Sequence, residues 1–252
     1  RQAVTDRHHS GARMSIRLEN VIKSFGEPPT QIIKNVSFEL GDGEFVALTG
    51  RSGSGKSTLL YMISSLDNPT SGKVLLQGQN IAEMPQQELH AFRNTQMGFI
   101  FQYHYLLPEF TALENVLMPA IKAGTAQQKR AEATELLKRF DLGQRMHHLP
   151  SQLSGGESQR VAIARALIMN PKFIFADEPT GSLDTVNAMN VMRIFQQVNR
   201  ETGCTIVYVT HDTDFAALAQ KQILLVDGEV SAITMKKGAK IKAAPLKKKR
   251  LT

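Results

Sequence analysis

Residues 50–57 read Gly-Arg-Ser-Gly-Ser-Gly-Lys-Ser, and this stretch decides the fold. It fits the pattern G-x-x-x-x-G-K-[ST], with a short apolar run at 45–49 before it and a helical pattern from Lys56 after it. Glycines let the backbone approach phosphate groups closely, and successive N–H groups at a helix N-terminus favour an anion. We therefore expect a phosphate site in which Lys56 contacts the β- and γ-phosphates and the Ser57 hydroxyl binds Mg²⁺.

Short strand patterns alternate with helical patterns on both sides of a mostly helical middle third. The strands are expected at 16–25, 35–40, 45–49, 73–81, 98–102, 172–177, 205–210 and, around an Asp-Gly turn, within 223–233. The helices are expected at 56–66, 113–121, 129–140, 160–170 and 186–201. This alternation predicts an α/β fold with a mainly parallel sheet, in which the helical stretch of about 105–165 is an insert.

Length and composition are those of a globular protein. The chain has 252 residues, of which 42% are hydrophobic and 21% charged, enough for one large domain or two small ones. No apolar run approaches the roughly 18 to 20 residues of a membrane span, and the N-terminus lacks the apolar region of a signal peptide. The single cysteine, Cys204, excludes an intrachain disulfide, and its apolar surroundings predict a small core residue.

The net charge of +7 is concentrated near the two ends of the chain. After Glu229 the chain carries no acidic residue and eight basic ones, Lys236, Lys237, Lys240, Lys242, Lys247, Lys248, Lys249 and Arg250. Residues 1–13 are also net basic, so the remainder is slightly acidic and we expect no nucleic-acid partner. We expect 1–13 to be a disordered leader or a cloning remnant before a natural start at Met14. The basic tail, 236–252, is expected to be disordered, either as a solvated charge run or in contact with an anionic membrane surface.

A second motif, Phe-Ile-Phe-Ala-Asp-Glu at 173–178, is an apolar strand that ends in two carboxylates. Ligands of open α/β sheets bind at the carboxyl ends of the strands, which is where these side chains would lie. We expect Asp177 to hold Mg²⁺ through water and Glu178 to polarise the attacking water as a general base.

A third motif, Leu-Ser-Gly-Gly-Glu-Ser-Gln at 153–159, opens another helical pattern. Ser154 is a favourable N-cap residue, and Gly155 and Gly156 expose backbone N–H groups, which predicts a second anion site at a helix N-terminus. Helix capping alone is the simpler interpretation. It explains Ser154 but not the two glycines followed by Glu-x-Gln.

With these three motifs in this order, the chain resembles the nucleotide-binding domains of ABC ATPases over about residues 15–234. The motif at 153–159 is similar to their signature sequence. Gln102 matches the Q-loop glutamine, residues 182–184 match the D-loop, and His211 matches the switch histidine. Phe25 stands where the family places an aromatic ring on adenine, although a core position is the alternative. Arg51 replaces a common proline and leaves the Gly-Lys-Ser group intact.

The resemblance implies a P-loop NTPase core of ABC type over 14–235, with an N-terminal antiparallel β subdomain and the helical insert. It implies catalytic roles for Glu178, His211 and Gln102, and Mg²⁺ ligands Ser57, Gln102 and Asp177. The expected ATP contacts are Phe25, Gly50, Arg51, Ser52, Gly53, Ser54, Gly55, Lys56, Ser57, Thr58, Ser154, Gly155, Gly156, Glu157 and Asp184. It also implies a partner copy, because the signature of one chain covers the γ-phosphate bound by the other.

Residues 101–116 and 176–184 are similar to the subfamily of LolD, MacB and FtsE ATPases, and residues 106–119 are most similar to its lipoprotein-releasing members. This likeness implies a motor at the cytoplasmic face of a bacterial inner membrane that drives a transmembrane permease, contacted around Gln102–Phe110. Lipoprotein release is the expected function. Efflux of drugs, toxins or peptides and regulation of cell division remain open alternatives. The aromatic cluster in this region is either core packing or a groove for the permease.

Overall fold

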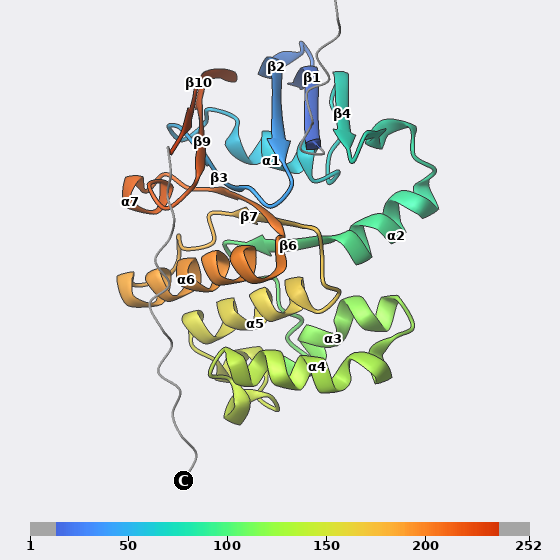
Figure 1. Cartoon of the computed structure of the whole chain (residues 1–252), viewed down its shortest axis with the longest axis vertical. Coiled ribbons are helices and arrows are strands. Elements are labelled where there is room, and N and C mark those ends of the chain that lie inside the picture. Colours follow the sequence, from blue (N-terminus) through green and yellow to red (C-terminus); the bar gives the residue numbers. More distant parts are fainter. Residues whose placement is uncertain (1–13, 237–252) are drawn as a thin grey trace, which may run out of the picture.

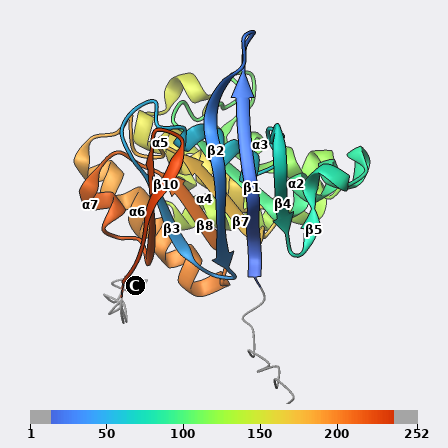
Figure 2. The ribbon, with the colours of Figure 1, turned by 90° about the horizontal axis from the view of Figure 1, so that it is seen from above.

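The computed structural model describes residues 14–236, which form two β-sheets and a set of helices (Figure 1). The first sheet is antiparallel, in the order β2-β1-β4-β5. Its strands are β1 (Met14–Phe25), β2 (Thr30–Gly41), β4 (Ser71–Leu76) and β5 (Gln79–Asn80). Figure 2 shows β2, β1 and β4 side by side across the top of the molecule.

The second sheet has the order β10-β9-β3-β8-β7-β6, and all its strands are parallel except the edge strand β10. Its strands are β3 (Phe45–Thr49), β6 (Met97–Phe101), β7 (Phe173–Asp177), β8 (Thr205–Val209), β9 (Lys221–Val226) and β10 (Glu229–Met235). The central strands β3, β7 and β8 are apolar along almost their whole length because both of their faces are covered.

The helices occupy three regions of the molecule. They are α1 (Lys56–Ile63), α2 (Gln86–Gln96), α3 (Ala112–Lys122), α4 (Ala126–Arg139), α5 (Gly155–Leu167), α6 (Thr185–Thr202) and α7 (Thr213–Ala216), with short 3-10 turns at Ile81–Glu83, Gly143–Arg145 and Pro150–Gln152. Helix α1 lies between the two sheets, and α5 and α6 lie on the other side of the mainly parallel sheet, with α3 and α4 beyond them (Figure 1).

Two hydrophobic cores follow from this layering. One joins the two sheets around α1 and includes Leu18, Leu59 and Val209, and the other joins the parallel strands to α3–α6 and includes Tyr208 and Phe195. Full burial of one such aliphatic or aromatic side chain contributes roughly 1.5 to 3 kcal/mol, so both cores hold the strand ends in fixed positions.

The predicted fold class is confirmed, with both sheets and the helical part present. Three details differ from the sequence-based expectation. Strand β2 begins at Thr30, before residue 35, and the single strand expected at 73–81 is broken by a turn at Gln77 and Gly78, both at positive φ. Helix α2 was not predicted, because none of its residues is buried and it therefore lacks an apolar repeat.

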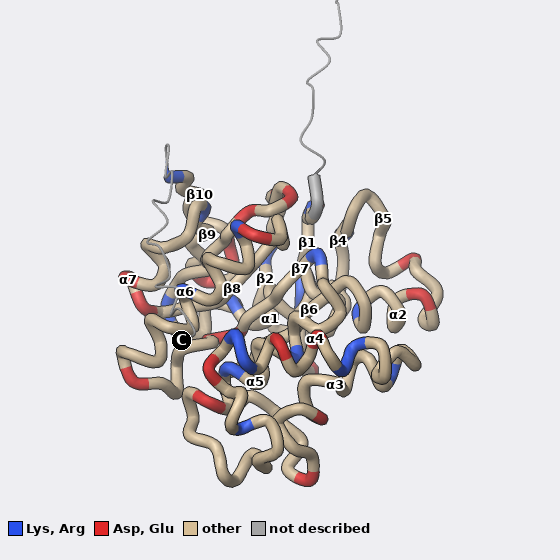
Figure 3. The backbone as a smooth tube through the Cα atoms, turned by 60° about the horizontal axis from the view of Figure 1, so that its bottom comes forward, with Lys and Arg blue, Asp and Glu red and all other residues tan. Residues whose placement is uncertain are grey.

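Three other expectations concern burial, membrane spans and charge. Cys204 is buried, as predicted, and burial raises the pKa of its thiol to about 12. Within residues 14–236, every helix is too short or too polar to cross a membrane. Acidic and basic residues are interspersed over this part of the chain (Figure 3). The expectations for the leader and for all of the tail except Lys236 lie outside the described residues.

Candidate functional site

The parallel register brings the expected site residues to one edge of the sheet. Asp177 on β7 pairs with Phe101 on β6 and with Val209 on β8, and Val209 pairs with Leu48 on β3. The four strands therefore end at the same level. The segments that follow them carry the phosphate loop, Gln102, Glu178 and His211, at the edge where ligands of such sheets bind.

The phosphate loop needs glycine at two positions for different contacts. Gly50 has φ 142°, and a Cβ atom there would lie 2.2 Å from the carbonyl oxygen of Leu225. Gly55 has φ 96° and precedes α1, and its Cβ would lie 2.7 Å from a methyl of Ile33 on β2. The loop is thus pressed between β2 and β9 in a backbone conformation that side chains disfavour.

Polar groups of the loop point inward. The Lys56 ammonium donates to the carbonyl oxygens of Gly50 and Arg51, each at 2.9 Å, so the side chain lies across the loop. The Ser54 hydroxyl is buried and has no hydrogen-bond partner among the described residues. Ser52 and Gly53 are exposed at the tip of the loop, and Thr58 is half-buried in the first turn of α1.

The Asp177 carboxylate is held at both oxygens by helix α1. Ser57 donates from Oγ to Oδ1 at 2.9 Å, and Tyr61 donates from its hydroxyl to Oδ2 at 2.8 Å. Burial and the hydrogen bond to Asp177 raise the pKa of Tyr61 well above its usual value, so the phenol stays protonated and acts as the donor. The predicted pair Ser57 and Asp177 is therefore in direct contact.

Glu178 and His211 also lie together. The His211 Nδ1 atom is 3.1 Å from each carboxylate oxygen of Glu178. The Glu178 side chain is only 19% exposed while that of His211 is 71% exposed, so the histidine forms the outer, accessible side of the pair. Glu178 has φ 46°, which turns the chain sharply after β7.

Gln102 lies beside the segment that joins β7 to α6. Its carbonyl accepts a hydrogen bond from the Ser182 hydroxyl at 3.2 Å, and its amide lies against Gly181, where a Cβ atom would be 3.1 Å from Nε2. Within residues 14–236, no hydrogen bond joins its side chain to Ser57 or Asp177. The expected group of three magnesium ligands is therefore only partly assembled.

The signature residues form a capping box at the start of α5. The Ser154 Oγ atom accepts from the backbone N–H of Glu157 at 3.3 Å, and the Glu157 carboxylate accepts from the backbone N–H of Ser154 at 2.8 Å. The hydrogen bond from the Ser154 backbone, with further help from the Ser154 hydroxyl and Arg145, lowers the pKa of Glu157. Ser154 therefore caps α5, as the simpler interpretation predicts, and this capping does not explain the two glycines that follow it.

The signature glycines face the start of α6. A Cβ atom on Gly156 would lie 2.6 Å from Oδ1 of Asn187, and one on Gly155 would lie 3.9 Å from Leu183. Asp184 caps α6 by accepting from the backbone N–H of Asn187 at 2.9 Å, and this bond is the main cause that lowers the pKa of Asp184. Among the described residues, no hydrogen bond links the signature to the phosphate loop, so the two predicted anion sites of one chain are not in direct hydrogen-bond contact.

Phe25 is 48% exposed, which disagrees with the alternative that it is a core residue. Phe25 is the last residue of β1 and pairs with Thr30 on β2. Two residues after Thr30 on the same strand, the carbonyl oxygen of Ile32 would lie 3.1 Å from a Cβ atom on Gly55 of the phosphate loop. The Lys23 ammonium sits 4.9 Å from the centre of the Phe25 ring. The ring is therefore an accessible flat surface on the β-strand pair that borders the phosphate loop.

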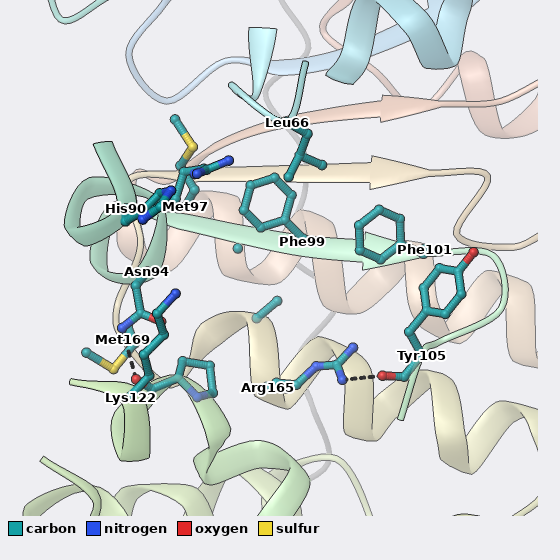
Figure 4. Close-up of a pocket in the computed structure, with 14 residues that line it drawn as sticks. Leu66, His90, Asn94, Met97, Phe99, Phe101, Tyr105, Lys122, Arg165 and Met169 are labelled. Atoms are coloured by element: carbon teal, nitrogen blue, oxygen red, sulfur yellow. Dashed lines mark hydrogen bonds between the residues drawn. The ribbon is translucent and has the colours of Figure 1, made fainter. Parts of the chain in front are cut away.

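A cavity of about 480 Å³ lies next to the Gln102 segment, between α2 and β6 on one side and α3 and α5 on the other (Figure 4). Phe99, Phe101 and Tyr105 form an aromatic row along it. Arg165 on α5 donates to the backbone carbonyls of His104 and Tyr105 at 2.6 and 2.7 Å. His104 and Tyr105 both have positive φ, so this arginine fixes a strained turn.

The donor set at the sheet edge fits a magnesium nucleotide. Mg²⁺ prefers oxygen ligands and is usually bound by one or two carboxylates together with substrate phosphates. Ser57 and Asp177 supply such oxygens beside a loop that holds a buried, unpartnered Ser54 hydroxyl. Within residues 14–236, no cluster of three or more His, Cys, Asp or Glu side chains is suited to a metal ion.

Sequence reasoning missed three residues of this region: Tyr61, Arg165 and Asn187. Each lies outside the quoted motifs and touches one of them through packing of distant segments. Only Tyr61 carried a usable signal. It follows Ser57 by four residues on an expected helix, so both side chains face the same direction.

Comparison with known proteins gives results consistent with this geometry. The sequence profile of the family described as ABC transporter matches residues 33–181. The chain is also similar to two curated proteins called "Lipoprotein-releasing system ATP-binding protein LolD". For the protein from Leptospira interrogans the identity is 57% over 218 residues, which is 86% of this chain and 91% of that protein. For the protein from Bacteroides thetaiotaomicron it is 46% over 216 residues, 85% of this chain and 98% of that protein.

A similar solved structure is described as the dimeric structure of a post-hydrolysis state of the ATP-binding cassette MJ0796 bound to ADP and Pi. It shares 41% identity with this chain and superimposes with a TM-score of 0.80. The match covers 87% of this chain and 98% of that one.

Proposed function

The chain belongs to the ABC transporter family, and we propose that it is the ATP-hydrolysing subunit of a transporter that releases lipoproteins from a bacterial inner membrane. The observation that carries this proposal is the 57% identity, over 86% of the chain, to a protein named for lipoprotein release. The second relative, 46% identical, carries the same name. Efflux and division control are therefore not favoured.

Binding of ATP and magnesium would use the groups at the carboxyl edge of the sheet. The loop N–H groups, Lys56 and the start of α1 surround the phosphates, while the exposed ring of Phe25 stacks on the base. Ser57 and Asp177 would hold a Mg²⁺ ion, with Gln102 as a further oxygen donor, and the ion would supply positive charge to neutralise the phosphates.

Hydrolysis would depend on the pair at the ends of β7 and β8. Glu178 accepts a proton from the attacking water as general base. His211 holds the carboxylate through Nδ1 and, being largely exposed, can contact the γ-phosphate on its other side. Together these two residues would orient the attacking water at the ends of β7 and β8.

Two copies of the chain would share each nucleotide. Ser154, Gly155, Gly156 and Glu157, with Asp184 nearby, form an anion site that is separate from the phosphate loop of the same chain. A partner copy that brings its phosphate loop to this site gives the signature a ligand. The related cassette MJ0796 is described as dimeric, which supports this arrangement.

The permease would dock in the cavity beside Gln102. Its lining includes His90, Arg93, Lys122 and Arg165 and no acidic residue, around an aromatic row (Figure 4). Tyr105 in this lining is 62% exposed, and Tyr103, two residues before it in the chain, is 71% exposed. These features suit a short partner segment with an apolar anchor and acidic neighbours. Through that contact the chain would sit at the cytoplasmic face of the membrane.

The test is reconstitution of the tagged protein with the transmembrane subunits that co-purify from membranes. We expect proteoliposomes loaded with a lipoprotein to release it with ATP and Mg²⁺, but not with a non-hydrolysable analogue. Tyr103→Ser should lose the transmembrane subunits and keep nucleotide binding, whereas Met235→Ser, at another exposed apolar residue, should behave as wild type. ATP turnover that is stimulated by a drug or peptide, without lipoprotein release, would contradict the proposal.

A further inference from the structure

Helix α1 presents two hydroxyl groups to the same carboxylate. Ser57 and Tyr61 are four residues apart, so they lie one above the other on one face of the helix. Their hydroxyls reach different oxygens of Asp177, Oδ1 at 2.9 Å and Oδ2 at 2.8 Å. Within residues 14–236, these are the only side chains that hydrogen-bond that carboxylate.

We propose that the Tyr61 hydroxyl is a positioning group of the magnesium site, which holds Oδ2 of Asp177 so that Oδ1 stays turned toward Ser57. This inference rests on the proposed role of Asp177 in holding the ion. Nothing in the motif sequences assigns the role to Tyr61, since the phosphate-loop pattern ends before it.

The packing of Tyr61 suits a positioning role. Its ring packs against the core between the two sheets, and its hydroxyl emerges from that core at the end of β7. The terminal torsion of an aspartate is soft, so a carboxylate held at one oxygen can rotate. A rigid aromatic donor on the second oxygen removes that freedom before the ion arrives.

The hydroxyls of Ser57 and Tyr61 would have different roles when a magnesium ion binds. Ser57 would offer its hydroxyl oxygen to the ion, so its hydrogen bond to Asp177 would change. Tyr61 bonds the oxygen on the other side and can keep its bond throughout. Outer partners that orient metal-binding groups are worth roughly 10- to 100-fold in metal affinity or activity. Because Asp177 would act through water, we expect the lower end of this range.

The experiment measures binding of a fluorescent, non-hydrolysable ATP analogue to the full chain as free Mg²⁺ is varied. Tyr61→Phe keeps the ring and removes the hydroxyl. We expect it to need roughly tenfold more free Mg²⁺ for half-maximal binding. Its affinity for the analogue in EDTA should equal that of wild type, because among the described residues the hydroxyl donates to Asp177 and makes no hydrogen bond to the phosphate loop.

Two control variants make the result decisive. Tyr208→Phe removes another buried hydroxyl, one that donates to the Phe215 carbonyl in the other core, and should match wild type. Asp177→Asn should show a larger magnesium defect than Tyr61→Phe.

A wild-type magnesium response in Tyr61→Phe, with Asp177→Asn impaired, would overturn the role of Tyr61 alone. A wild-type response in Asp177→Asn would overturn the metal role of Asp177 and this inference with it. Loss of binding in EDTA by Tyr61→Phe would also overturn the inference, because the hydroxyl would then be holding the fold.

Discussion

At the scale of single residues, Glu178 combines a strained backbone with a hydrogen bond shared by both of its carboxylate oxygens. The left-handed conformation at φ 46° costs a residue with a side chain on the order of 1 to 2 kcal/mol. Such strain persists where the surrounding structure requires it, often at functional sites. Here it turns the carboxylate out of the line of β7 and toward His211 at 3.1 Å.

Replacing Glu178 by glutamine tests its role as base. The amide fills the same space but cannot accept the proton of a water, so we expect Glu178→Gln to bind ATP and to turn it over at least about a hundredfold more slowly. The protein should accumulate as an ATP-bound dimer, measurable by size-exclusion chromatography. Glu135→Gln, an exposed glutamate paired with Lys138 on α4, is the matched control and should keep full activity. Turnover near that of wild type in Glu178→Gln would remove this residue from the mechanism.

The residues of the site were predictable from sequence where a motif fixes them to a strand end. Asp177 and Glu178 follow an apolar run, and His211 follows another, so the sheet edge could be inferred from alternation alone. The spacing of four residues places Tyr61 on the helix face of Ser57, but its contact with Asp177 could not be assigned, because the two residues are 116 positions apart in the sequence. The placement of Gln102 against Gly181 was equally inaccessible to sequence reasoning.

At the scale of elements, two helices begin with the same device. Helix α5 starts with Ser154 and Glu157, and α3 starts with Thr111 and Glu114, each as a capping box. In both boxes the hydrogen bonds from the cap residue lower the pKa of the glutamate. Only the box on α5 encloses paired glycines, Gly155 and Gly156, which face the start of α6.

Variants of the two N-cap residues, Ser154 and Thr111, can distinguish a role in helix capping from a role in phosphate binding. Loss of an N-cap hydroxyl costs about 1 kcal/mol, so Ser154→Ala and Thr111→Ala should lower the free energy of unfolding by similar amounts in denaturant titrations. We expect only Ser154→Ala to lower ATP turnover as well. Equal turnover in the two variants would mean that Ser154 serves as a cap and nothing more.

The stability that the α5 capping box contributes should depend on pH in a defined direction. Because folding lowers the pKa of Glu157, its contribution to stability is complete above the ordinary glutamate pKa and is lost as the pH falls through the lower, folded value. The difference in unfolding free energy between wild type and Glu157→Gln should therefore be constant near neutral pH and shrink in acid. A difference that grows in acid would contradict the assigned hydrogen bonds.

Elements with a strong apolar repeat were predictable, and those without one were not. Strands β3, β7 and β8 are buried at almost every position and helix α6 is buried on one face, and their sequences show these apolar patterns. Helix α2 has no buried residue, so only its place beside β6 in the folded protein reveals it. The break between β4 and β5 depends on positive φ at Gln77, which an ordinary polar side chain does not signal.

At the scale of the whole molecule, the two predicted anion sites belong to different parts of the fold. The phosphate loop joins β3 to α1 beside the antiparallel sheet, and the signature opens α5 on the opposite side of the mainly parallel sheet (Figure 1). We propose that each nucleotide is enclosed by the phosphate loop of one copy and the signature of the other. Neither motif could reveal this pairing from the sequence of one chain without the family resemblance.

Complementation between two damaged copies tests that claim most directly. In the first arrangement, one copy carries Lys56→Ala and its partner carries Ser154→Arg, so both defects fall in one composite site and the other site stays whole. In the second, a copy with both changes is paired with a wild-type copy, and each composite site carries one defect. Differently tagged copies are co-purified with the membrane partner, and ATP turnover is measured. We predict greater turnover from the first arrangement. Greater turnover from the second would contradict the account, because a site contained in one chain would then remain whole in the wild-type copy.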